Sequence, residues 1–219
     1  MKTNLYNLKG EKTDTVNLPD AIFKAKVNKK LMTQAVRVYL SNQRQSPAKA
    51  KTRGEVNYST RKIYKQKGTG RARHGDRKAP IFVHGGKAHG PTGTQNYHLK
   101  LNKNMRKLSL FSALTSKLKG KELIVISGME KIEPKTKNMA KVLLNIKNKI
   151  AKIKNTNKKL KMTIILPNTM ESIIRAGRNI QRLNLMQANS LNTYEILNGG
   201  LILLMDSSID VLKKTFLKE

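Results

Sequence analysis

Continuous apolar runs alternate with amphipathic stretches over the second half of the chain. The runs predict buried strands at 122–127, 161–167, 182–188 and 201–206. Apolar residues at helical spacing predict helices at 135–150, 169–180, 193–198 and 207–217, the second with Asn168 or Thr169 as its N-cap. Strands that are apolar on both faces and separated by helices are typical of a parallel sheet covered on both sides. The pattern therefore predicts an α/β fold.

The first half of the chain supplies further elements of the same fold. Segments 3–8 and 13–18 predict two short strands, and 28–43 predicts a helix. A strongly amphipathic helix is predicted at 103–119, ended by Gly120. We find no internal repeat and no second core. The sequence thus predicts one globular domain, formed by residues 1–42 and 99–219, with a mostly parallel central sheet.

The intervening segment 43–98 has a different composition. Between Ser41 and His98 the large aliphatic residues and Phe are reduced to Val56, Ile63, Ile81, Phe82 and Val83, while eight of the fourteen glycines lie here. Such a segment buries too little apolar surface to offset the entropy of ordering itself. Loops longer than about fifteen residues within a compact domain are usually functional or disordered. We therefore predict one long, extended basic loop inserted in the domain.

Charge points to the kind of partner. The chain has 45 Lys and Arg against 13 Asp and Glu, a net charge of +32. Repulsion of this size favours a polyanionic partner, with nucleic acid first and an anionic membrane surface second. No apolar run of about eighteen residues predicts a membrane span, and the N-terminal residues lack the pattern of a signal or transit peptide. The absence of cysteine fits a reducing compartment.

Constellations for catalysis or cofactor binding are missing. No phosphate-binding P-loop pattern occurs, and Gly68-Thr-Gly70 lacks the third glycine and the flanking strand and helix of a dinucleotide fingerprint. Asp14, Asp20, Asp206 and Asp210 lie near element ends, where helix capping accounts for them. The four histidines, His74, His84, His89 and His98, cluster without cysteine or regular spacing, so RNA-contacting imidazoles are favoured over zinc. We predict no enzyme activity, no cofactor and no metal.

RNA binding accounts for more of the pattern. Between Lys65 and Arg73, cations alternate with small residues that let the backbone approach phosphates. Tyr58, Tyr64 and Tyr97 are interleaved aromatics that can stack on unpaired bases. A solvated, disordered charge run is the alternative, but Gly85-Gly86 and Gly90-Pro91 favour defined turns.

Cations outside the loop complete the predicted interface. Lys135 and Lys137 fall in the positive first turn of a predicted helix, where a phosphate can dock, and Arg175 and Arg178 lie near the end of another. The predicted RNA-binding residues are Lys49, Lys51, Arg53, Arg61, Lys62, Tyr64, Lys65, Lys67, Arg71, Arg73, Arg77, Lys78, Lys87, Arg106, Lys135, Lys137, Arg175 and Arg178.

Several motifs together closely resemble the L-four family of large-subunit ribosomal proteins. They are "KTRGEV" (51–56), "RKIYKQKGTGRARHGD" (61–76), "GG" and "HGP" (85–91), "LKLNKNMRKLSLFSALTSK" (99–117) and "EPKTK" (133–137). The resemblance implies a Rossmann-like globular domain whose loop threads into 23S-type rRNA. It also implies that the loop lines and narrows the nascent-peptide exit tunnel beside a loop of the L-twenty-two family. By the same motif the tunnel tip is formed by Lys65, Gln66, Lys67, Gly68, Thr69, Gly70 and Arg71.

The sequence also departs from this family. Tyr64 stands where Trp is frequent, which preserves stacking, and His89-Gly90-Pro91 with Thr94 and Gln95 replaces a Phe-Gly-Pro and Pro-Arg pattern in the return segment. The implied protein is a cytoplasmic ribosomal component of a bacterium; a plastid or mitochondrial ribosome is the alternative. We expect neighbouring ribosomal proteins as partners, no membrane and no stable homo-oligomer. A free RNA-binding regulator that represses its own expression is the second functional hypothesis.

Overall fold

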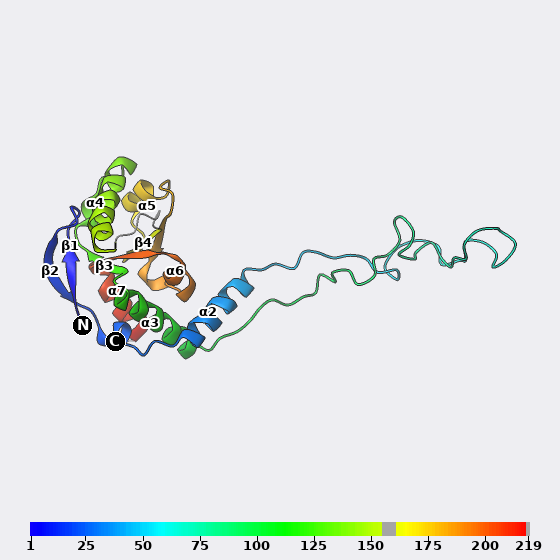
Figure 1. Cartoon of the computed structure of the whole chain (residues 1–219), viewed down its shortest axis with the longest axis horizontal. Coiled ribbons are helices and arrows are strands. Elements are labelled where there is room, and N and C mark those ends of the chain that lie inside the picture. The colour runs from blue at the N-terminus through cyan, green and yellow to red at the C-terminus, as the bar shows by residue number, and fades with distance from the viewer. Residues whose placement is uncertain (155–160, 218–219) are drawn as a thin grey trace. The chain divides into compact units, whose positions relative to one another are not determined.

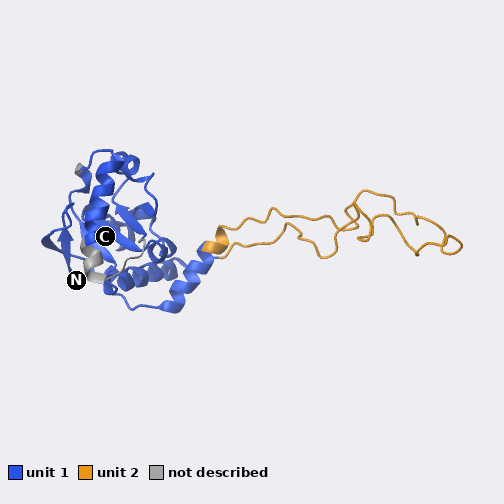
Figure 2. Cartoon of the chain, turned by 45° about the horizontal axis from the view of Figure 1, so that its top comes forward, with its two compact units in different colours: residues 1–39, 100–219 blue, residues 40–99 orange. Residues whose placement is uncertain are grey.

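The protein divides into two compact units, coloured separately in Figure 2. The computed structural model describes residues 1–154 and 161–217. The globular unit comprises Met1–Tyr39 and Lys100–Glu219, and the basic loop comprises Leu40–Leu99. The division falls within one helix, α2 (Lys29–Asn42).

A mostly parallel sheet forms the centre of the globular unit (Figure 1). Within the described residues its strands, in the order β2-β1-β3-β6-β4-β5, are β1 (Lys2–Tyr6), β2 (Lys12–Asn17), β3 (Leu123–Ile126), β4 (Met162–Leu166), β5 (Leu183–Gln187) and β6 (Leu201–Met205). β1 pairs with β2 in antiparallel fashion, and every other pairing is parallel. The α/β fold predicted from the apolar runs is confirmed.

Helices flank the sheet. They are α1 (Asp20–Phe23), α2, α3 (Lys103–Lys119), α4 (Thr136–Lys154), α5 (Glu171–Gly177), α6 (Thr193–Asn198) and α7 (Ser207–Leu217), with short 3-10 turns η1 (Met129–Lys131) and η2 (Ala188–Ser190). No helix of the described ranges has the length and hydropathy needed to cross a membrane.

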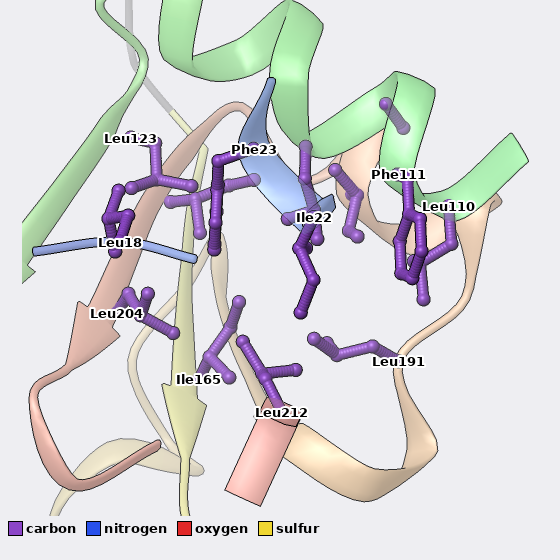
Figure 3. Close-up of a cluster of buried hydrophobic side chains, with 14 of the residues drawn as sticks. Leu18, Ile22, Phe23, Leu110, Phe111, Leu123, Ile165, Leu191, Leu204 and Leu212 are labelled. Atoms are coloured by element: carbon purple, nitrogen blue, oxygen red, sulfur yellow. The ribbon is translucent and has the colours of Figure 1, made fainter. Parts of the chain in front are cut away.

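The central strands β3, β4 and β6 are buried on both faces, which explains why they are almost entirely apolar. In β6, Ile202 and Leu204 pack into one cluster with α1, α3, α6 and α7, whereas Leu201, Leu203 and Met205 pack into a second cluster with α4 and α5. Because successive strand residues point to opposite faces, each central strand contributes to both clusters. Figure 3 shows the first cluster, with Phe23 and Ile22 of α1 between α3 and the sheet.

Some details of the helix ends differ from expectation. α5 begins at Glu171 after Met170, which has no side-chain cap, and neither Asn168 nor Thr169 is its N-cap. The Thr169 hydroxyl instead accepts a hydrogen bond from the Gln187 amide at 2.6 Å, because it lies where β4 and β5 both end. Asp14 lies in β2 and is no helix cap; its carboxylate accepts from the Thr15 amide.

Two residues, Gly120 and Lys121, end helix α3. Gly120 is the C-cap, as predicted, but its φ of −75° is an ordinary right-handed value. The left-handed residue is Lys121, with φ of 53°. The amides of both residues bond back to the last turn, so the helix closes without a left-handed glycine.

The globular unit is expected to fold without the basic loop. Every strand and every buried hydrophobic side chain in the described ranges belongs to the globular unit. A chain in which a short Gly/Ser linker joins Arg44 to His98 should therefore unfold in one cooperative transition, measured by circular dichroism and calorimetry in parallel with the full chain. A gradual, non-cooperative melt would show that the loop contributes to the core.

Candidate nucleic-acid interface

The basic loop consists of an outgoing arm, residues 40–64, and a return arm, residues 72–99. The two arms run antiparallel and meet at a few backbone contacts. The Ala50 amide donates to the Pro91 carbonyl at 2.8 Å, and the Lys87 amide donates to the Lys51 carbonyl at 2.9 Å. An isolated antiparallel bridge joins Lys49 to Thr92. These contacts leave most backbone groups of the arms free to face water or RNA.

A polar clasp, formed by Ser41, Asn42, Tyr97 and Leu99, joins the two arms at the start of the loop. The Asn42 side chain accepts from the Leu99 amide at 2.8 Å and donates to the Leu99 carbonyl at 3.1 Å. The Ser41 hydroxyl donates to the Tyr97 carbonyl at 2.6 Å, and the Arg44 guanidinium lies 4.2 Å from the centre of the Tyr97 ring. The clasp fixes which residues of the two arms lie opposite each other at the start of the loop.

Gly86 lies at a point where the two arms approach closely. A Cβ atom on this residue would lie 2.2 Å from the Arg53 amide nitrogen and 2.5 Å from its Cα. Backbone atoms cannot yield as a flexible side chain does, so only glycine permits this approach. The predicted turn residues Gly85-Gly86 thus bring the return arm against the outgoing one.

The predicted tip, residues 65–71, is exposed and rich in left-handed glycine. Gly68 and Gly70 have φ of 82° and 61°, and no atom lies within 4 Å of a Cβ added to either. The Lys62 ammonium closes the tip, since it donates to the Gln66 side chain at 2.7 Å and to the His74 carbonyl at 3.1 Å. The centre of the tip thus carries only small side chains, and its long side chains are exposed to solvent.

Aromatic side chains connect the arms below the tip. The Tyr64 hydroxyl donates to the Ala72 carbonyl, and the Tyr64 ring lies edge-on to His74 with centroids 6.1 Å apart. His74 in turn lies 4.9 Å from Phe82. Tyr64 and His74 are accordingly half-buried in the loop, whereas His84, His89 and His98 are exposed. Tyr64 was predicted to stack on bases. In this structure its hydroxyl and ring also make contacts within the loop, to Ala72 and His74.

The electrostatics of the loop are strongly one-sided. Residues 40–99 contain 13 Lys and Arg against Glu55 and Asp76, a net charge of +11. Lys49 lies 3.6 Å from the Glu55 carboxylate, and a hydrogen bond from the Thr52 amide, together with Lys49, lowers the pKa of Glu55. The other predicted RNA-binding cations of the loop are exposed, apart from half-buried Lys78: Lys51, Arg53, Arg61, Lys62, Lys65, Lys67, Arg71, Arg73, Arg77 and Lys87.

In the globular unit the predicted cations are exposed but do not form one patch. Lys135 precedes α4, where it pairs with Glu133 at 3.1 Å, and Lys137 lies in a first turn that has no acidic residue. That turn follows the carboxyl end of β3, whereas Arg175 and Arg178 end α5 and lead to the amino end of β5. Arg175 also pairs with Glu171 at 2.9 Å.

Arg106 belongs to a separate basic turn of the globular unit. It is exposed in the first turn of α3, which contains no acidic residue and begins with Lys103. The Arg106 carbonyl accepts from the Ser109 hydroxyl at 2.7 Å, so the backbone of this turn is held while its guanidinium stays free to reach a partner.

Among the residues that had not been predicted are Asn42 and Arg44, which help to close the start of the basic loop. Both act through partners more than fifty residues away, Leu99 and Tyr97, so no local pattern marks them. Across the described ranges no three His, Asp or Glu side chains come together as metal ligands.

An α/β unit that carries a glycine-rich, strongly basic loop defines a class of protein suited to binding a polyanion over a long surface. Residues 16–215 match the model of the Ribosomal protein L4/L1 family. The chain belongs to this family.

Individual relatives match over nearly their full length. A protein named large ribosomal subunit protein uL4 from Thermoanaerobacter sp. is 36% identical over 98% of both chains. The protein of the same name from Parabacteroides distasonis is 37% identical over 99% of both chains. The one from Clostridium novyi is 33% identical over 97% of this chain and 98% of its own.

Proposed function

We propose that the protein is a structural constituent of the large ribosomal subunit and binds 23S-type rRNA through its basic loop. The observation that supports this most directly is the loop itself, where 13 cations face two acids on arms with little backbone pairing. The names and bacterial sources of its relatives agree. Its role is architectural rather than catalytic, and its place is the ribosome in the bacterial cytoplasm.

The geometry suggests how the loop carries out this role. Exposed Lys and Arg on both arms neutralise phosphates that folded RNA brings close together, and this term depends on backbone rather than base sequence. Guanidinium groups add bidentate hydrogen bonds to phosphates, and the loop supplies them from Arg53, Arg61, Arg71, Arg73 and Arg77. At the tip, Gly68, Thr69 and Gly70 fit gaps that larger side chains would block.

Residues 65–71 would then line the nascent-peptide exit tunnel. Their solvent-facing cations and the absence of any apolar side chain suit a polar wall along which a growing chain moves without adhering. A loop of an L-twenty-two family protein would supply the opposing wall.

A salt titration tests the proposed RNA contact. A plot of log K against log salt has a negative slope, and each neutralised phosphate adds about 0.7–0.9 to its magnitude. Replacing Lys65, Lys67, Arg71 and Arg73 with Gln should therefore reduce the magnitude of the slope by about 3. Binding is measured with the full chain and transcribed 23S-type rRNA. The control replaces exposed Lys9, Lys12, Lys119 and Lys214 of the globular unit with Gln, which removes the same charge and should change the slope by less than about 1.

An unchanged slope in the loop variant would move the binding surface to Lys135, Lys137, Arg175 and Arg178. Co-sedimentation addresses assembly separately: a structural constituent is recovered at one copy per large subunit, whereas a free regulator remains at the top of the gradient.

A further inference from the structure

A closed turn in the return arm, residues 78–86, holds one apolar side chain inside the loop. The Phe82 amide donates to the Ala79 carbonyl at 3.1 Å, the Gly85 amide to the Phe82 carbonyl at 3.0 Å, and the Gly86 amide to the Lys78 carbonyl at 2.9 Å. Phe82 is half-buried and packs against His74. The turn is therefore a defined local structure.

The neighbours of Phe82 point the other way. Ile81 is 69% exposed and Val83 is 81% exposed, the two highest values among the large apolar side chains of the described ranges. Both are β-branched, with few rotamers, so they present methyl groups in nearly fixed positions. Such a pair in water is unfavourable and indicates a surface that a partner covers.

The surroundings of this apolar pair restrict the partner. Arg77 and Lys87, which flank the turn in the sequence, are exposed, Lys78 is half-buried, and Asp76 is the acidic residue nearest in sequence. An apolar protein surface would strip water from these cations without replacing it. RNA meets both demands, since its phosphates match the cations and the faces of unstacked bases and riboses match the methyl groups.

We propose that Ile81 and Val83 cover the face of an unstacked nucleotide of the rRNA. This rests on the proposed function and adds a feature to it: the loop has an apolar anchor that is insensitive to salt, besides its salt-sensitive cations. The turn positions the anchor, with Phe82 turned toward His74 holding Ile81 and Val83 outward.

The test uses a double variant in which both Ile81 and Val83 are replaced by Thr. Threonine keeps the β-branched shape, so the turn is retained, while a hydroxyl replaces one apolar branch of each side chain. Affinity for transcribed 23S-type rRNA is expected to fall about tenfold at every salt concentration, with an unchanged salt slope. Chemical probing of the complex should show one or two nucleotides that are protected by the wild-type chain and reactive with the variant.

Leu144→Gln is the matched control, because Leu144 is 54% exposed on α4 in the globular unit. It should leave affinity and nucleotide protection unchanged, and thermal melts should be the same for all three proteins. Unchanged affinity and protection in the double variant would overturn the anchor and assign the turn to a protein partner. A wild-type chain without salt-dependent rRNA binding would instead overturn the proposed function.

Discussion

Inserting two residues after Thr69 is expected to leave large subunits at normal abundance while changing what passes the tunnel. The insertion point is unpacked, since within the described residues no atom beyond the chain neighbours lies within 4 Å of a Cβ added to Gly68 or Gly70. The predicted RNA-binding cations lie along both arms, so the inserted residues are expected to cost few RNA contacts. If the tip lines the exit tunnel, as proposed, they lengthen it into a space that is already narrow.

Ribosome profiling and sensitivity to small molecules that bind in the tunnel measure this effect. A loss of about 1.4 kcal/mol of contact changes the affinity of such a molecule tenfold. Sucrose gradients provide the control and should show the normal subunit ratio. Accumulation of precursor particles would contradict the assignment and make the tip an anchor for RNA folding.

Phe23→Ala is expected to produce the largest loss of stability in the globular unit. Phe23 is 1% exposed and Ile22 is fully buried, and together they fix α1 in the cluster with α3 (Figure 3). Truncating such a ring costs about 3–5 kcal/mol, against a total stability of about 5–15 kcal/mol. The urea midpoint should fall accordingly, with little change in slope.

Leu144→Ala is the control for this substitution. The side chain is half exposed on α4, so its truncation should change the free energy of unfolding by about 0.5 kcal/mol or less. A similar loss in both variants would mean that α1 is not a specific anchor of the core.

The sequence predicts the regular elements because burial on both faces leaves a direct signature. In β3 and β6, every residue is Leu, Ile, Val or Met, and the observed bounds fall within the predicted runs 122–127 and 201–206. α1 leaves no such signature. Four residues are too few for helical periodicity, and Ile22 and Phe23 of Asp20–Phe23 are buried in a cluster that α3 shares.

The loop illustrates the opposite limit. Composition alone identifies its cations and glycines, because charge and missing apolar surface are properties of the segment as a whole. Its internal geometry depends on single polar pairs such as Tyr64 with Ala72 and Ile63 with Gly75. Many Ser, Asn and Gly residues could form such pairs, so the sequence does not distinguish those that do.

The clasp at Asn42 and Leu99 has a consequence for how the loop can vary in length. By pairing the two ends, it closes a ring of chain, and the entropy of closing a flexible ring grows only with the logarithm of its size. Doubling the number of enclosed residues costs about 0.6 kcal/mol. The fold is thus nearly indifferent to arm length, and the distance that the arms must span in their partner is free to set it.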